Sequence, residues 1–212
     1  VSGVAIARWG PSVTTSAPAQ PRVAVIGAGV QARSHLPVID HLLPGAEVVL
    51  CDRDPRRLGA LADEVAAGGL GDGFAAVETT TDPVAAVDGA ALVLTVVSFG
   101  PDRQSIPAEA FTSDATVVAV DYDMCVPASL ASGAALFLTD DRKQFLANRS
   151  GETFAGYPEP VAMMGEAILA ETVRPAGRVL VTHLGVGLAD VVFGDAILRA
   201  AESAAIGTVL ER

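Results

Sequence analysis

The sequence predicts an α/β protein with a Rossmann-like, doubly wound and mostly parallel sheet, followed by a C-terminal helical return segment. Six short apolar runs recur along the 212 residues, and helical segments separate the first three. The runs are continuous rather than alternating, as strands buried on both faces of a parallel sheet are. Alternation of strand and helix favours an open sheet with right-handed crossovers.

The expected elements follow in chain order. The first nine residues are expected to end a helix, and the proline- and serine-rich stretch 11–21 is expected to be a surface connection. The six expected strands are VAVIG, EVVLCD, ALVLTVVS, ATVVAVDYD, ALFLTD and RVLVTH. Helices are expected over residues 32–43, 55–67, 82–87, 161–171 and 188–205, with a loop over 148–160.

Composition excludes several classes of protein. Half of the residues are hydrophobic and 18% are charged, so overall disorder is excluded. The net charge of -11 and the absence of a basic run argue against a nucleic-acid surface. The longest apolar stretches, such as 90–99, are shorter than the roughly 18 residues of a membrane-spanning helix.

No His/Cys cluster has metal-ligand spacing. Cys51 and Cys125 are expected to be reduced packing residues rather than a disulfide, as is typical of a cytoplasmic protein.

The stretch GAGVQA has the GxGxxA form of a dinucleotide-binding turn, with a strand before it and a helix after it. Gly27 permits the sharp turn, Gly29 lets the backbone approach a pyrophosphate, and Ala32 allows close packing of helix on strand. The amides of Val30 and Gln31 are expected to face phosphate oxygens at the start of the helix.

An acid at the end of the second strand completes this pattern. Asp52 follows the glycine turn by about 20 residues, where a carboxylate can accept hydrogen bonds from ribose hydroxyls. Since it would also repel a 2′-phosphate, NAD is favoured over NADP, while Arg53 beside it keeps NADP open. The alternative is a vestigial domain that packs well and binds no ligand.

Several stretches, taken in order, resemble the ornithine cyclodeaminase and mu-crystallin family across essentially the whole chain. They are GAGVQARSHL, CDRDPRRLGALADEV, ATVVAVDYD, LFLTDDRKQ, MMGEAI and GVGLADVVFGDAILRAAESAAIG. Two positions depart from the family pattern. Asp190 follows Ala189 directly, where the family has two more residues, and MCVP follows Asp123, where the family often has a small residue, Pro-Gly and then Lys or Arg.

The resemblance implies an NAD-dependent enzyme that transfers a hydride at the α-carbon of a small amino or imino acid. By motif position Asp123 is the implied acid/base, with Asp121 as a rival. Thr95 and Ser98 would border the nicotinamide, or are ordinary strand-end hydroxyls. Relatives carry a further N-terminal domain that binds the substrate carboxylate and forms a homodimer. A mu-crystallin-like binding module without catalysis, or an accessory subunit, are the alternatives.

Three parts of the chain are expected on this reading. Residues 1–20 form an entry helix and linker, 21–150 the dinucleotide-binding domain, and 151–212 a continuation whose last strand and helix return toward the N-terminal domain of the relatives. His183 ends the last expected strand and is a further candidate for the cleft. The polar turn at 140–142 is expected to be structural.

Overall fold

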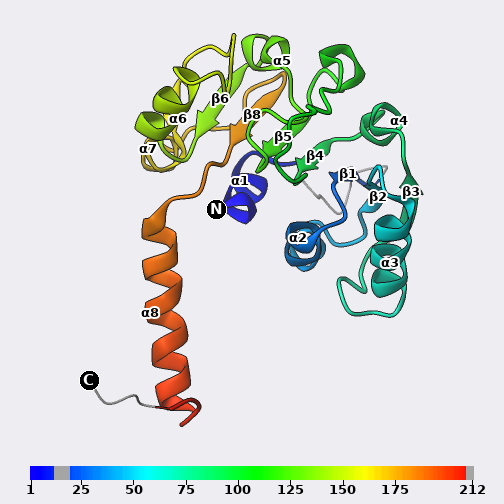
Figure 1. The fold of residues 1–212 in the computed structure, drawn as a ribbon, viewed down its shortest axis with the longest axis vertical. Coiled ribbons are helices and arrows are strands. Elements are labelled where there is room, and N and C mark those ends of the chain that lie inside the picture. The colour runs from blue at the N-terminus through cyan, green and yellow to red at the C-terminus, as the bar shows by residue number, and fades with distance from the viewer. Residues whose placement is uncertain (12–19, 209–212) are drawn as a thin grey trace.

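The computed structural model describes residues 1–11 and 20–208, so the connection predicted over 11–21 lies largely outside the described residues. One parallel sheet organises the chain, in the order β3-β2-β1-β4-β5-β8-β6-β7 (Figure 1). The strands are β1 Arg22–Ile26, β2 Glu47–Cys51, β3 Ala76–Thr80, β4 Leu92–Thr95, β5 Thr116–Ala119, β6 Leu136–Thr139, β7 Ala162–Met163 and β8 Val179–Thr182. The helices are α1 Ser2–Trp9, α2 Val30–Leu42, α3 Pro55–Ala66, α4 Pro83–Val87, the 3₁₀ turn η1 Ala108–Ala110, α5 Ala128–Ser132, α6 Arg142–Arg149, α7 Met164–Leu169 and α8 Gly187–Ser203.

The predicted fold class is confirmed, and all six predicted strands are present. The sequence did not predict the two edge strands. β3 is exposed along most of its length and has no apolar run, while β7 is only two residues long. The helices α5 and α6 were also not predicted from the sequence. The polar turn at 140–142 is in fact the start of α6, where the Asp141 carboxylate accepts a hydrogen bond from Gln144 N at 2.9 Å.

The last strand of the chain lies in the middle of the sheet. β8 pairs with β5 on one side and with β6 on the other. The sheet therefore draws strands from both sides of the predicted boundary at residue 150. Because every pairing is parallel, the carboxyl ends of all the strands meet at one edge.

Two apolar cores cover the two faces of the sheet. Neighbouring strand residues point to opposite faces, so Val23 and Val25 of β1 belong to one core while Ala24 and Ile26 belong to the other. The first core includes residues of α1, α2, α3 and α7, and the second includes residues of α4, α5 and α6. The continuous apolar runs of the sequence follow from this burial on both faces.

The final helix lacks such contacts. Figure 1 shows α8 extending away from the sheet and its covering helices, and none of its residues is buried. Its large apolar side chains are all exposed: Leu188, Val191, Val192, Phe193, Ile197 and Leu198. In the described part of the chain no helix combines the length and hydropathy needed to cross a membrane.

Trp9 ties α1 to the sheet. Its side chain is fully buried, and Nε1 donates a hydrogen bond to the carbonyl of Thr172 at 3.0 Å. Its own carbonyl accepts hydrogen bonds from the Thr116 hydroxyl of β5 and from Arg174 Nε. One residue thus joins the first helix to a central strand and to the segment before β8.

Replacing Trp9 with Ala should lower the free energy of unfolding by about 3–5 kcal/mol, because a large buried side chain is lost and a cavity remains. Urea denaturation followed by circular dichroism measures this without relying on the single tryptophan of the chain. The matched control is Val4→Ala on the exposed side of α1, which should change stability by about 0.5 kcal/mol or less. Equal losses in the two variants would contradict the anchoring role of Trp9.

Candidate functional site

A crevice opens between the turns that follow β1, β2 and β4. Five predicted site residues line it: Gly27, Gly29, Asp52, Arg53 and Ser98. Gln104 also lines it, and no sequence pattern pointed to that residue. The strand order reverses between β1 and β4, and ligands of open parallel sheets bind outside the carboxyl ends of strands at such a point.

The fold requires a glycine at position 27 of the turn but not at position 29. Gly27 has a φ of +112°, and a Cβ on it would lie 2.8 Å from the carbonyl oxygen of Val96. The fold itself therefore requires glycine there, which confirms the predicted sharp turn. Gly29 has a φ of -88°, and a Cβ on it would meet no atom within 4 Å. Nothing in the described chain requires glycine at 29, and the space in front of it is open.

The start of α2 is not capped. Its N-cap is Gly29, which offers no side-chain hydrogen bond, and there is no acid in its first turn. Val30 and Gln31, the first residues of the helix, are exposed. By contrast, three other helices begin at an aspartate whose carboxylate accepts a first-turn amide: Asp54, Asp82 and Asp141. The first-turn amides of α2 therefore donate to no side-chain cap and remain open beside the crevice.

Asp52 holds the glycine turn in place. Its Oδ2 accepts a hydrogen bond from Ala28 N at 2.7 Å, and its Oδ1 accepts one from Asp54 N at 2.8 Å. The sequence suggested only a ligand-binding role, whereas the structure adds this structural one. Each oxygen retains a lone pair for a further donor. Arg53 and Arg57 also line the crevice, and Arg57 Nε lies 3.7 Å from the carboxylate of Asp54.

Thr95 does not line the crevice. Its hydroxyl is fully buried and donates a hydrogen bond to Asp121 Oδ1 at 2.6 Å, while Val97 N donates to Oδ2 at 3.4 Å. Burial raises the pKa of Asp121 to about 6, although these hydrogen bonds oppose the shift. Cys51 and Cys125 are both buried and have free thiols, and burial raises the pKa of the Cys51 thiol to about 11.

Asp123 is a second buried carboxylate in the same turn. Its Oδ2 forms an ion pair with the guanidinium of Arg103 and accepts a hydrogen bond from Phe154 N at 2.8 Å. Tyr122, between the two acids, has a φ of +60°, a strained conformation for a bulky residue. Its hydroxyl donates to the carbonyl of Leu184 at 3.3 Å. Asp123 does not itself line the crevice.

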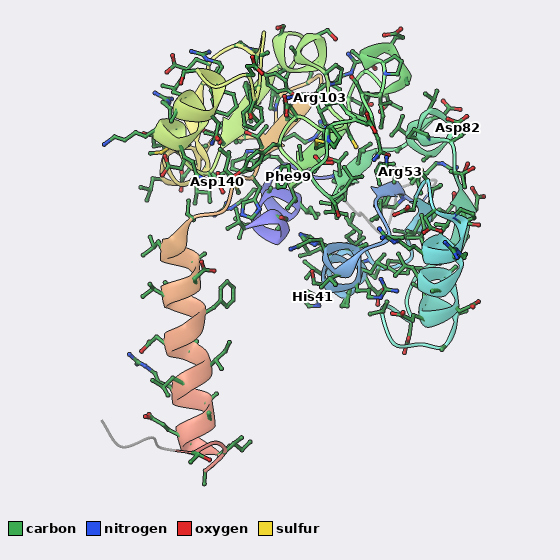
Figure 2. All side chains as sticks on the ribbon, viewed as in Figure 1. His41, Arg53, Asp82, Phe99, Arg103 and Asp140 are labelled. Carbon is green, nitrogen blue, oxygen red and sulfur yellow. The ribbon has the colours of Figure 1, made fainter. Side chains whose placement is uncertain are left out.

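Asp140 holds the turn between β8 and α8, and Figure 2 shows it near the base of that helix. Its carboxylate accepts hydrogen bonds from Leu184 N at 3.0 Å and from Gly185 N at 2.8 Å. His183 Nε2 lies 3.4 Å from the same carboxylate. Burial lowers the pKa of His183, and the charge of Asp140 opposes that shift. This pair is a support for the turn at the carboxyl edge.

No protein-family model and no curated protein sequence matches this chain. Solved structures do match it. The Δ(1)-pyrroline-2-carboxylate reductase of Thermococcus litoralis, in complex with NADH and L-proline, has a TM-score of 0.76 at 14% identity, covering 99% of this chain and 65% of that one. The iminosuccinate reductase of Paracoccus denitrificans, in complex with NAD⁺, has a TM-score of 0.75 at 19% identity. The match covers 100% of this chain and 64% of the reductase. A lysine cyclodeaminase has a TM-score of 0.76 at 19% identity. The match covers 98% of this chain and 58% of the cyclodeaminase.

At these identities the likeness shows the fold. It supports, at that level, the family resemblance of the sequence motifs. The chain spans 58–65% of the length of these three structures.

Asp121 should make stability depend on pH in a defined direction. Because its folded pKa of about 6 lies above its ordinary value of 3.8, the folded state retains a proton that the unfolded state releases between these pH values. Raising the pH through this window should therefore cost stability, on the order of 3 kcal/mol. The Asp121→Asn variant lacks this titration, so its stability relative to wild type should rise from about pH 4 to about pH 7. Urea denaturation at several pH values tests this, and a constant difference would contradict it.

Proposed function

We propose that this chain binds NAD in the crevice at the carboxyl edge of the sheet. The observation that carries the proposal is Gly29, since no neighbouring atom and no backbone strain requires a glycine there. It lies at the uncapped start of α2, where a phosphate would meet free amides and the positive end of the helix dipole. Structural neighbours in complex with NADH and with NAD⁺ support the same ligand.

The remaining crevice residues fit the other parts of the ligand. Gly29 and the amides of Val30 and Gln31 would hold the pyrophosphate, and the open lone pairs of Asp52 would accept the ribose hydroxyls. Ser98 would border the nicotinamide end. Arg53 and Arg57 offer charges to which a 2′-phosphate could bind, so selection of NAD over NADP depends on Asp52.

We further propose that the chain is the cofactor-binding part of an enzyme of the ornithine cyclodeaminase type, which acts on a small amino or imino acid. Bound NAD would accept a hydride from the α-carbon of the substrate, or NADH would deliver one. Asp123 is the proposed acid/base. Its Oδ2 is fixed by two donors, whereas Oδ1 accepts no hydrogen bond from the described residues, so one oxygen is anchored and the other is available for proton transfer.

The exposed apolar surface of α8 and the greater length of the structural neighbours support a further proposal. A substrate-binding part and a homodimer interface lie beyond these 212 residues. On this proposal the chain alone binds the dinucleotide without turnover. If amino acids do not reduce NAD when the complete enzyme is assayed, the binding-module alternative of mu-crystallin type is favoured.

Replacing Gly29 with Val should abolish tight NADH binding while costing about 1 kcal/mol or less in stability, because only the N-cap preference is affected. NADH fluorescence titration and urea denaturation measure the two effects. The matched control is Gly59→Ala in α3, another position where a Cβ meets no atom within 4 Å. It should leave NADH affinity unchanged. Wild-type affinity in Gly29→Val would mean that any dinucleotide binds elsewhere.

Replacing Asp52 with Asn should weaken NADH binding by roughly 1.5–3 kcal/mol, the contribution of a charge-assisted hydrogen bond. Since the change also disturbs the glycine turn, the ratio of the NADPH and NADH dissociation constants is the sharper measurement. Both ligands use the turn, so this effect cancels in the ratio. We expect the preference for NADH to narrow in Asp52→Asn and to widen in Arg53→Gln. Ratios that shift in the same direction would contradict the assigned roles.

A further inference from the structure

Arg103 is held beside Asp123 by the loop that follows β4. Gln104 N donates to the carbonyl of Met124, and Ile106 N donates to the carbonyl of Cys125, both at 2.8 Å. These bonds run the loop along the turn that carries Asp123. Gln104 lines the crevice, and Arg103 directly precedes it in the chain.

The two members of the ion pair differ in exposure. The side chain of Asp123 is 6% exposed, whereas that of Arg103 is 44% exposed. A buried carboxylate needs a paired cation, and a single N–H of Arg103 supplies that pairing. A guanidinium has further donors in a planar fork, and in the described part of the chain Nη1 alone is engaged. Since the Arg103 side chain is 44% exposed, its remaining donors are open to a ligand from solution.

We propose that Arg103 binds the carboxylate of the substrate, and this inference rests on the proposed function above. Guanidinium and carboxylate groups pair through two parallel hydrogen bonds, which fix orientation as well as position. A substrate carboxylate bound to Arg103 would bring the attached α-carbon and its nitrogen close to Asp123. The cofactor-binding chain thus contributes a cation of its own to the substrate site, which the sequence did not indicate.

A structural role for Arg103 would consist only of neutralising Asp123. The two roles can be distinguished by how each variant changes the affinity of the chain for an external carboxylate. If Arg103 binds an external carboxylate, then Asp123 competes with that ligand, and removing the charge of Asp123 should tighten ligand binding. Removing Arg103 should weaken it even when Asp123 is uncharged, because the contact between guanidinium and ligand carboxylate is lost.

The test is a titration of the chain with pyrrole-2-carboxylate, with the uncharged pyrrole-2-carboxamide as matched probe, in the presence and absence of NADH. NMR shifts of the Gln104 and Phe154 amides report the occupancy. We expect the carboxylate, but not the carboxamide, to bind saturably. Binding should weaken about tenfold or more in Arg103→Gln, since a charge-assisted contact is lost, and should tighten several-fold in Asp123→Asn. Arg199→Gln, on exposed α8, should match wild type.

The double variant Arg103→Gln/Asp123→Asn removes both charges and avoids an unpaired buried carboxylate if Arg103→Gln alone fails to fold. It should bind the carboxylate more weakly than Asp123→Asn does. Equal binding in these two variants, or equal shifts with carboxylate and carboxamide, would overturn the role of Arg103. NADH titration of the same samples separates the two proposals. Carboxylate binding that depends on Arg103 without any NADH affinity would keep this site and overturn the NAD assignment.

Discussion

Four aspartates at the ends of strands join the turns of the carboxyl edge by accepting hydrogen bonds from neighbouring turns. Asp52 after β2 accepts an amide of the β1 turn, and Asp121 after β5 accepts the hydroxyl and an amide of the β4 end. Asp140 after β6 accepts two amides of the β8 turn, and Asp123 accepts the amide of Phe154. In a parallel sheet the strands end together and leave backbone groups unpaired at that edge. Short acidic side chains accept hydrogen bonds from these groups and so hold the turns in place. The positions of the crevice, of the ion pair between Arg103 and Asp123 and of the start of α8 depend on these turns.

A different set of aspartates caps the starts of helices. Asp54, Asp82 and Asp141 occupy the starts of three helices, while the start of α2 has a glycine and no acid. A capping carboxylate at α2 would compete for the amides that a phosphate needs. The helices α1 and α5 also begin without a side-chain cap, but only the start of α2 lies beside the crevice among these three.

The sequence indicates this fold mainly through burial. Strands covered on both faces are apolar throughout, so the six inner ones are visible as continuous runs, whereas the exposed edge strand β3 leaves no such signal. Local spacing reveals Gly27, Gly29 and Asp52, because turn geometry ties them to one motif. It cannot reveal that Thr95 faces Asp121, or that Arg103, a single arginine in a loop, reaches Asp123 twenty residues later. Those contacts depend on the side-by-side pairing of β4 and β5 and on the path of the loop between them.

The turn held by Asp140 is the point from which α8 extends away from the rest of the chain. The helix begins at Gly187, two residues after the last backbone amide that this carboxylate holds, and no packing along its length fixes its direction. With 17 residues and a rise of about 1.5 Å per residue, it is about 25 Å long. A rotation of about ten degrees at its base would move its far end by about 4 Å. Such a rotation at the turn held by Asp140 would displace the far end by nearly the spacing between neighbouring strands.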